Sequence, residues 1–362
     1  MIVERITSLQ GFESVRSAYE ELCERDPHRT VFVCWNWLRA YITALQPRWT
    51  LLCVRDGPQP IGFCFLVERG IKLGPVHLYR ELALGAYPAA DYASLVIGEG
   101  EKSAVLRALA GAIACMRWDV FRACNVNDVR VRILVKRLAR MHEVTVEAQN
   151  PSRFLPLPAA WTEYAARASA GDRSARHIVK RSHAWPGSRF VEAHDASIDD
   201  DIEALLQLRH FRWRGSLRSA RRTYGRLFRE AYAQGCCRLG VLRSAEGRPL
   251  AAQAAFVDCA KRTWVAYTVA HDTRLERQFL RRRPGIVMMA SGIEHAVAQG
   301  FRCLDFGRGD ERYKCDLGSK VQMLDNFIVR RRSLRSRVAE SLWTASGSTK
   351  ALVRRVVLGR TR

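Results

Sequence analysis

Ionisable side chains gather in one short stretch near the end of the chain, Leu304-Asp-Phe-Gly-Arg-Gly-Asp-Glu-Arg-Tyr-Lys-Cys315. The apolar residues around Asp305 predict a strand end, and Gly307 and Gly309 allow the backbone to turn tightly and to approach a ligand closely. Carboxylate, phenol and ammonium groups in one loop suit proton transfer and the stabilisation of a developing negative charge. The alternative interpretation is a polar turn that Asp305 caps.

A second stretch contains residue types that suit the binding of an anion. Arg281-Arg-Arg-Pro-Gly-Ile-Val287 opens an apolar helical pattern, and Pro284 fits the first turn of a helix. The free N–H groups and the positive dipole end of a helix N-terminus favour phosphate. Arg281, Arg282 and Arg283 add donors for phosphate oxygens. The alternative is an ordinary helix start on a basic surface.

The residues around both stretches predict an α/β unit that brings them together. We expect a strand at 263–270, a loop at 271–283, a helix at 284–299 and a strand at 303–306. In a strand–helix–strand unit the ligand site lies at the carboxyl ends of the strands. The arginine-rich loop and the glycine loop therefore belong to one predicted site.

The first half of the chain repeats part of this pattern. Residues 51–67 and 239–257 each contain a strand, a glycine-containing turn, a proline and a second strand, and each follows a helical stretch. A duplicated unit leaves such a repeat in a sequence, and prolines at 151, 156 and 158 predict a break in regular structure between the halves. We therefore expect an α/β (α+β) protein with two tandem units of mixed sheets flanked by helices, at 1–150 and 151–335, and a basic tail at 336–362.

The chain is strongly basic. It contains 59 Lys and Arg residues against 36 Asp and Glu, a formal net charge of +23, and only eight of the basic residues are Lys. A positive field attracts polyanions such as nucleotide cofactors, nucleic acid or anionic lipid headgroups. Charge by itself does not choose among these partners.

Missing patterns exclude several classes of protein. No run of about 18 apolar residues predicts a membrane-spanning helix, and the N-terminus lacks the apolar stretch of a signal peptide. Eleven cysteines without C-x-x-C spacing predict reduced thiols rather than a disulfide framework or a zinc site. The sequence contains neither a P-loop nor a G-x-S-x-G motif. We expect a cytoplasmic protein that uses no metal.

The glycine loop resembles a known signature. The order Asp305-Phe-Gly-x-Gly-x-x-x-Tyr-Lys314, after a helix that Pro-Gly opens and Gly300 closes, is similar to the C-terminal motif of the CelD-like acyltransferases. These belong to the GNAT superfamily and are often linked to exopolysaccharide or cellulose formation, and Fem-type transferases have similar arrangements. The resemblance covers roughly residues 30 to 335. Further matching segments, in the expected order, are Trp35-Asn-Trp37, the Asp56-Gly57 hairpin, Asp91-Tyr92 and Phe154-Leu-Pro-Leu-Pro-x-x-Trp161.

The resemblance implies an N-acyltransferase of two tandem GNAT-like units, with its active site in the second half and acetyl-CoA or another acyl-CoA as co-substrate. GNAT enzymes bind the CoA pyrophosphate through Arg/Gln-x-x-Gly-x-Gly/Ala at the start of a central helix, which here corresponds to Arg282–Val287. Val287 stands where the family has Gly or Ala. The implied cofactor-binding residues are Arg281, Arg282, Arg283, Gly285, Ile286 and, through its backbone on the pantetheine arm, Val269.

The resemblance also implies catalytic roles, because GNAT enzymes let an amine attack the thioester directly. Tyr313 is the implied acid for the leaving thiolate, and its neighbours Arg312 and Lys314 predict a lowered pKa. Asp305 or Glu311 is the candidate base for the incoming amine. Lys314 is a candidate to bind an anionic acceptor or to stabilise the oxyanion.

Two other functions remain open. A Fem-like transferase would take its acyl group from aminoacyl-tRNA and use the basic helix at 173–181 on RNA phosphates. The region 161–236 is short for the helical arm that Fem proteins often carry. A non-enzymatic nucleic-acid-binding protein would explain the charge but not the glycine loop, and no known nucleic-acid-binding module is present. We expect a small-molecule or glycan amine as acceptor, and no nucleic acid other than tRNA in the alternative.

The C-terminal tail is basic. From Arg330 to Arg362 the chain has ten basic residues and one acid, Glu340, and its apolar residues predict two short amphipathic helices around Ser346-Gly-Ser348. One interpretation is a packed helix followed by a solvated end. The other is peripheral contact with the anionic inner membrane surface, near a lipid-linked or exported glycan, where each basic residue contributes about 1 kcal/mol.

Overall fold

The computed structural model describes residues 1–73, 75–98, 100, 102–182, 187–275 and 283–333, together with Ser336 and Ser341. The chain forms two compact units. Unit 1 contains Met1–Leu38, Gln46–Asn150 and the chain from Met323 to the end of the last strand. Unit 2 contains Arg39–Leu45 and Pro151–Gln322. The basic tail predicted at 336–362 lies outside the described residues except for Ser336 and Ser341.

The first half of the chain contains seven strands and five α-helices among its described residues. In order they are β1 (Ile2–Ile6), α1 (Leu9–Ser14), α2 (Arg16–Arg25), α3 (Trp35–Leu45), β2 (Arg48–Asp56), β3 (Gln59–Leu73), β4 (Val76–Leu84), β5 (Val96–Ile97), α4 (Lys102–Ala114), β6 (Val120–Val126), α5 (Val129–Leu138) and β7 (Glu143–Pro156). Most residues of α3 are buried, among them Trp37, Leu38 and Tyr41.

The second half begins with two helices that follow β7. In order its elements are α6 (Trp161–Ser169), α7 (Arg173–Ser182), β8 (Arg189–Glu192), α8 (Ile198–Trp213), α9 (Leu217–Ala220), a π-turn (Arg221–Gly225), α10 (Arg226–Ala233), β9 (Cys237–Arg243), β10 (Pro249–Asp258), β11 (Thr263–His271), α12 (Pro284–Ala298), β12 (Cys303–Arg308), α13 (Arg312–Asp316) and β13 (Lys320–Arg330). The predicted strand–helix–strand unit around α12 is confirmed, and β11 extends one residue further than expected.

The two units have the same strand connections, which confirms the expected tandem GNAT-like fold. In unit 1 the order β1-β2-β3-β4-β6 is antiparallel except for the parallel pair β4 and β6, and α4 joins these two strands. In unit 2 the order β8-β9-β10-β11-β12 is antiparallel except for the parallel pair β11 and β12, and α12 joins them. Each unit therefore contains one crossover helix between parallel strands.

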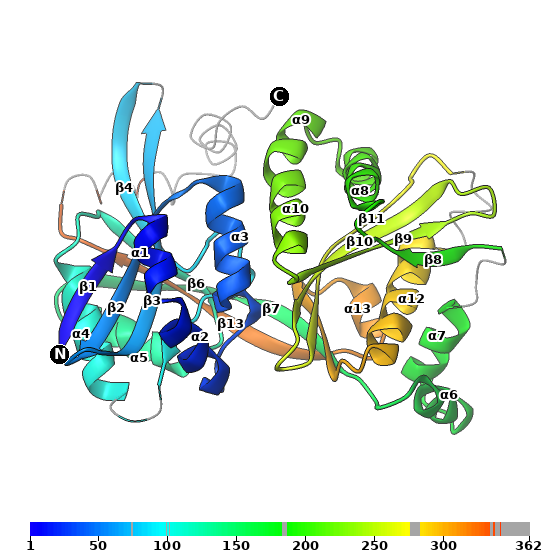
Figure 1. Ribbon diagram of the computed structural model, residues 1–362, viewed down its shortest axis with the longest axis horizontal. Helices are drawn as coiled ribbons and strands as arrows, with labels where there is room; N and C mark the ends of the chain where they lie inside the picture. The colour runs from blue at the N-terminus through cyan, green and yellow to red at the C-terminus, as the bar shows by residue number, and fades with distance from the viewer. Residues whose placement is uncertain are drawn as a thin grey trace. The chain divides into compact units, whose positions relative to one another are not determined.

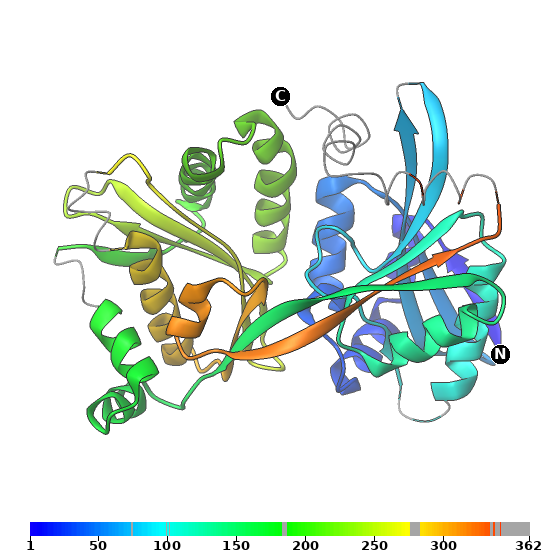
Figure 2. The same ribbon diagram turned by 180° about the vertical axis from the view of Figure 1, so that it is seen from behind.

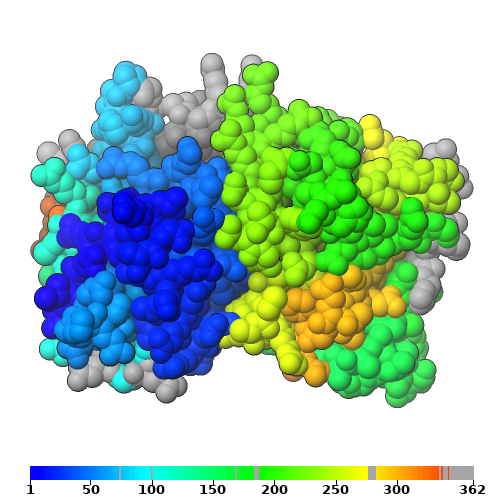
Figure 3. Space-filling model, in the orientation of Figure 1, coloured from blue at the N-terminus to red at the C-terminus, as the bar shows by residue number. Residues whose placement is uncertain are grey.

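Helices cover both faces of each sheet. In unit 1, α1 and α2 lie on one face and α4 and α5 on the other (Figures 1 and 2). The apolar residues under α4 and α5 form a continuous core with Leu52, Leu66 and Leu82 of the sheet. In unit 2, α12 packs on the sheet face that carries Ala255 and Trp264, and α7 lies beside α12 (Figure 3).

The last strand of each half belongs to the other unit. β13 comes from the end of the chain and pairs antiparallel with β6 in unit 1, with Phe327 opposite Ala123. The second part of β7 pairs antiparallel with β12 in unit 2, with Leu155 opposite Leu304. Residues 323–330, which we expected in the second half, therefore complete the sheet of unit 1.

The predicted break at Pro151 is wrong. β7 runs without interruption from Glu143 through Pro151 to Pro156. A proline is tolerated in a strand where its missing N–H is not needed by the neighbouring strand. The Pro151 carbonyl still accepts the backbone N–H of Gly309 at 2.8 Å.

A buried ionic cluster joins distant segments of unit 1. The Arg130 guanidinium contacts Asp26 Oδ2 at 2.7 Å and Asp128 Oδ2 at 2.8 Å, and it donates to the carbonyl of Leu95 at 3.0 Å. Burial alone would raise the pKa of Asp128, but hydrogen bonds from Arg130 and Ser94 hold it below its usual value. The cluster fixes the end of α2 and the start of α5 on the same core.

We expect Arg130→Ala to destabilise unit 1 by about 3–5 kcal/mol, because it leaves two buried carboxylates without their cation. Urea unfolding followed by circular dichroism measures this change. Arg140→Ala, at an exposed arginine, is the control and should change stability by less than about 0.5 kcal/mol. Equal unfolding midpoints for the two variants would contradict the assigned role of the cluster.

Candidate active site

The parallel strands β11 and β12 pair only at their beginnings. Thr263, Trp264 and Val265 lie opposite Cys303, Leu304 and Asp305. Beyond Val265, β11 pairs with β10 alone among the described strands, up to His271. The two strands thus separate toward their carboxyl ends, and the second part of β11 presents an open backbone edge on the side of β12.

Asp305 explains why β12 turns where it does. Its carboxylate Oδ1 accepts the backbone N–H of Gly307 at 2.7 Å, and Gly307 has a φ of +64°. The Ser152 hydroxyl of β7 donates to the Gly307 carbonyl at 3.1 Å. The register between β7 and β12 shifts at the same place, between Asp305 and Arg308. The strand end is therefore bent and fixed by side chains, which agrees with the capped-turn interpretation of Asp305.

A cavity of about 210 Å³ lies beside the open edge of β11. It brings together five of the residues that the sequence singled out, which are Val269, Arg283, Gly285, Ile286 and Tyr313. They come from β11, from the start of α12 and from α13. The remaining lining residues are Arg212, His271, Pro284 and Met289.

The start of α12 forms one wall of the cavity. Arg283 precedes the helix with a φ of +54°, and Pro284 occupies the first turn. The N–H groups of Ile286 and Val287 donate to the Arg283 carbonyl at 2.8 and 3.1 Å. The positive end of the helix dipole and the Arg283 side chain thus lie at the same cavity, a combination that favours an anion.

Gly285 allows α12 to lie close to β11. A Cβ atom at this position would come within 3.1 Å of the Nδ1 atom of His271. A larger residue at this position would therefore crowd His271, which would have to shift by a few tenths of an ångström.

His271 is a functional candidate that the sequence did not reveal. Burial, helped by the charge of Arg212, holds its pKa below the usual value, so the imidazole is neutral near pH 7. Its Nδ1 atom is buried and has no hydrogen-bond partner in the described part of the chain. Such an atom is costly to leave unsatisfied, which favours a bound water or ligand group at this place.

Arg212 is the second residue that the sequence analysis missed. It lies in the last turn of α8, and its Nη1 atom donates to the backbone carbonyl of Val269 at 3.1 Å. One turn earlier, Arg209 donates to the Thr268 hydroxyl at 3.3 Å and lies over the ring of Tyr224. The end of α8 thus holds β11 and brings a guanidinium to the cavity.

Tyr313 lies in the cavity wall, but its predicted pKa shift is wrong. Burial raises the pKa of Tyr313 to about 12; Glu311 adds to the increase, and Arg212 opposes it. Desolvation dominates because the ring packs against the apolar core of unit 2. The hydroxyl is therefore a hydrogen-bond donor that stays protonated at neutral pH, and a weak proton donor to a thiolate.

Lys314 and Glu311 lie outside the cavity wall. Lys314 is 2% exposed at its side chain and donates from Nζ to the carbonyls of Arg308 and Gly309 at 2.7 and 3.3 Å. Its Nζ atom also contacts Glu311 Oε2 at 2.8 Å, while the Glu311 side chain is 57% exposed. Lys314 thus holds the glycine loop together, and Glu311 presents its carboxylate to solvent.

The remaining predicted residues give a mixed result. Arg281 and Arg282 lie outside the described residues. Val287, which departs from the family pattern, is buried in a core cluster with Leu242 and Leu250. Its side chain therefore packs in the protein interior. No group of three metal-ligating side chains is present in the described ranges, and no described helix has the length and apolar composition needed to cross a bilayer.

Comparison with known proteins identifies the type of domain around this cavity. Residues 173–315 match the family model described as an acetyltransferase (GNAT) domain, and this range contains every residue that lines the cavity. No curated protein matches the sequence. The chain thus contains a GNAT acetyltransferase domain at residues 173–315, which supports an N-acyltransferase.

Solved structures share the fold over almost the whole chain. FemX is 10% identical with a TM-score of 0.62, and the match covers 90% of this chain and 96% of FemX. A tandem GNAT protein from the clavulanic acid biosynthesis pathway is 10% identical with a TM-score of 0.54, covering 91% and 98%. A conserved protein of unknown function from Bacteroides thetaiotaomicron is 12% identical with a TM-score of 0.59, covering 91% and 100%. At these identities the likeness shows the fold alone.

We expect Asp305→Asn to keep most activity and stability, because an amide oxygen can still accept the Gly307 N–H. Asp305→Ala should lose about 1–2 kcal/mol of stability and loosen the glycine loop, because a buried N–H loses its acceptor. Thermal unfolding and steady-state acyl transfer measure the two effects. If Asp305→Asn were as inactive as Asp305→Ala while remaining stable, Asp305 would be a catalytic base and not a turn cap.

Proposed function

We propose that this chain transfers an acyl group, most simply acetyl, from acyl-CoA to the amine of a small molecule or glycan. The observation that carries the proposal is the convergence on one cavity of the α12 start, the open edge of β11 and Tyr313. An anion site suits the phosphates of CoA, and an extended backbone edge suits its amide-containing arm. A hydroxyl donor suits its thioester.

The residues at the start of α12 are proposed to bind the pyrophosphate of CoA. Arg283 supplies a charge-assisted donor, and the first turn of the helix supplies the dipole. His271, beside Gly285, offers its Nδ1 atom to the same part of the ligand. The open edge of β11 near Val269 pairs with the pantetheine arm. A cavity of about 210 Å³ holds only a part of such a ligand.

Tyr313 and Arg212 are proposed to stabilise the charge that develops during transfer. The neutral Tyr313 hydroxyl donates a hydrogen bond to the sulfur of the leaving thiolate, and Arg212 places a positive charge beside it. Glu311 is the candidate acceptor for the proton of the incoming amine, because its carboxylate is exposed while that of Asp305 is engaged by Gly307.

The CelD-like resemblance supports an acceptor in exopolysaccharide or cell-envelope biosynthesis, and the basic tail supports peripheral contact with an anionic membrane surface. The second candidate is a Fem-like transfer from aminoacyl-tRNA. The likeness to FemX concerns the fold, so the donor itself must be tested.

We expect purified protein to bind acetyl-CoA, and Arg283→Gln to weaken this binding by about tenfold through the loss of one charged contact. Calorimetry at two salt concentrations measures both affinity and its salt dependence. Arg302→Gln removes an equal charge from an exposed position of unit 2 outside the cavity and is the matched control.

Aminoacyl-tRNA is titrated in parallel in a gel-shift assay. Tight binding of aminoacyl-tRNA without measurable acetyl-CoA binding would overturn the proposed donor and favour the Fem-like function. Equal weakening by Arg283→Gln and Arg302→Gln would show that the α12 start is not the phosphate site.

We expect Tyr313→Phe to lower turnover by ~10²-fold, the scale of losing one donor to a developing negative charge. Since burial raises the pKa of Tyr313 to about 12, the hydroxyl stays protonated from about pH 6 to pH 10. The ratio of wild-type to variant turnover should therefore be constant over this range. A wild-type rate that falls above about pH 8, with no such fall in the variant, would instead indicate a tyrosine with a lowered pKa.

A further inference from the structure

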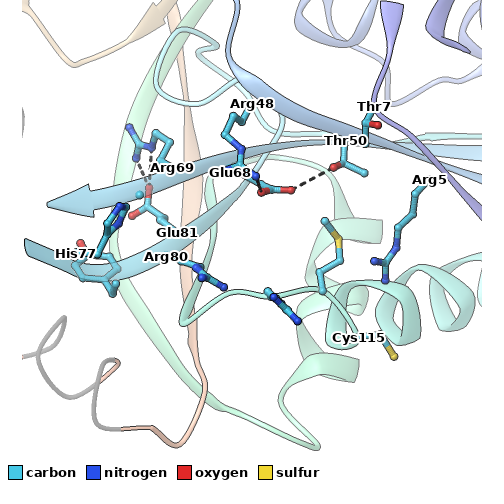
Figure 4. A pocket seen from close by; sticks show the side chains of 14 residues that line it. Arg5, Thr7, Arg48, Thr50, Glu68, Arg69, His77, Arg80, Glu81 and Cys115 are labelled. Carbon is cyan, nitrogen blue, oxygen red and sulfur yellow. Dashed lines mark hydrogen bonds and ion pairs between the residues drawn. The ribbon is translucent and has the colours of Figure 1, made fainter.

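Unit 1 contains a cavity of about 830 Å³ that the proposed acyl transfer does not use (Figure 4). Its walls come from the end of β1, the start of β2, the β3–β4 hairpin and the chain just after α4. This volume lies near the upper end of the range for small-molecule sites.

The register of the sheet explains why this surface is hollow and polar. Leu52, Leu66 and Leu82 lie on the face that α4 and α5 cover. Thr50, Glu68 and Arg80 each lie two residues from one of these leucines on the same strand, so they lie on the same face. α4 ends at Ala114, so this part of the sheet extends past the helix, and polar side chains replace the apolar core.

The cavity is positively charged. Five arginines and two glutamates line it, a net charge of +3 with His77 neutral. Glu81 is 1% exposed and already lies between Arg69 and Arg122. Glu68 contacts the Thr50 hydroxyl at 3.4 Å and Arg48 at 3.6 Å. Both carboxylates thus already contact other side chains. The remaining arginines of the cavity are therefore available to bind an anion.

Arg5, Arg80 and Arg117 supply the available guanidinium groups. None of them forms an ion pair with any residue in the described ranges. The backbone N–H of Arg80 is fixed by Asp119 Oδ2 at 2.8 Å, while its side chain points into the cavity (Figure 4). The Arg5 Nη2 atom makes one long contact, at 3.4 Å, with the carbonyl of Ala112.

The C-terminal end of α4 lies at the cavity and would by itself repel an anion. Its last carbonyls, however, already accept hydrogen bonds from arginines. The Arg331 Nη2 atom donates to the carbonyls of Ala114 and Met116 at 2.5 and 2.6 Å. The unfavourable end of the helix dipole is therefore neutralised before a ligand binds.

We propose that this cavity binds a small ligand with two or three negative charges carried by phosphate groups, such as a diphosphate ester. Arginine forks match phosphate oxygens, and the net charge of the lining equals that of such a ligand. The cavity lies at the C-terminal end of α4, whereas the counterpart of the proposed CoA site would lie at the N-terminal end of α4. The inference therefore does not rest on the proposed function.

Inorganic pyrophosphate is the probe, titrated into the full-length protein by calorimetry at about 0.15 M salt. The double variant Arg80→Gln/Arg117→Gln should weaken binding at least about tenfold, because it removes two charged donors. Arg107→Gln/Arg140→Gln removes the same charge from exposed positions of unit 1 outside the cavity and should bind like the wild type. All four arginines are exposed, and thermal unfolding confirms that both double variants fold.

The NMR resonances of the His77 ring report binding in this cavity alone, because the imidazole lies against Gly70 within the cavity wall. Pyrophosphate should shift them in proportion to occupancy, and saturating acetyl-CoA should not remove the shift. Binding that Arg283→Gln abolishes and Arg80→Gln/Arg117→Gln leaves intact would assign the probe to α12 and overturn the inference. Equal weakening by the two double variants of unit 1 would show general charge attraction and would also overturn it.

Discussion

The short pairing of β11 with β12 is the constraint on which the rest of unit 2 depends. Parallel strands that stayed paired over their full length would close the sheet and leave no room for a ligand. Here pairing ends after Val265 and Asp305. The Gly307 N–H donates a hydrogen bond to the Asp305 carboxylate, which fixes a turn in β12 at that point. The separation exposes a backbone edge on β11 and places α13, with Tyr313, opposite it. α12 must then begin at the same end, because it connects these strands.

In unit 1 the equivalent space between the parallel strands β4 and β6 is filled. β4 and β6 also pair over three residues, from Glu81 to Ala83. The space beyond is filled by the protein itself, since Ala93 forms a parallel bridge with Val126 and its neighbours enter the core. The exchanged strands β7 and β13 complete the sheets. The two units thus share a framework, and in unit 1 the segment around Ala93 occupies the place that stays open between the parallel strands of unit 2.

Charge is used differently in the two units. In unit 2, Arg212 and Arg283 reach one small cavity from the end of α8 and the start of α12, and burial keeps His271 and Tyr313 neutral between them. Desolvation keeps both groups neutral, and Arg212 adds to this effect on the pKa of His271 but opposes it on the pKa of Tyr313. In unit 1 the arginines surround a wider cavity, where the buried Glu81 is paired with Arg69 and Arg122, while Arg80 and Arg117 are exposed. The net charge of +23 is thus partly concentrated at two concave surfaces.

The sequence by itself determined the local elements and the end of the sheet where the site lies. The apolar pattern and the proline and glycine at 284–285 predicted α12 and its start, because these signals act between neighbours in the chain. It also singled out Gly285 and Tyr313. Only the tertiary structure decided the strand exchange, the turn-capping role of Asp305 and the burial of Lys314. It likewise brought Arg212 and His271 to the cavity from segments almost 60 residues apart. Desolvation depends on everything that packs around a group, so the direction of the Tyr313 pKa shift was not available from its charged neighbours in the chain.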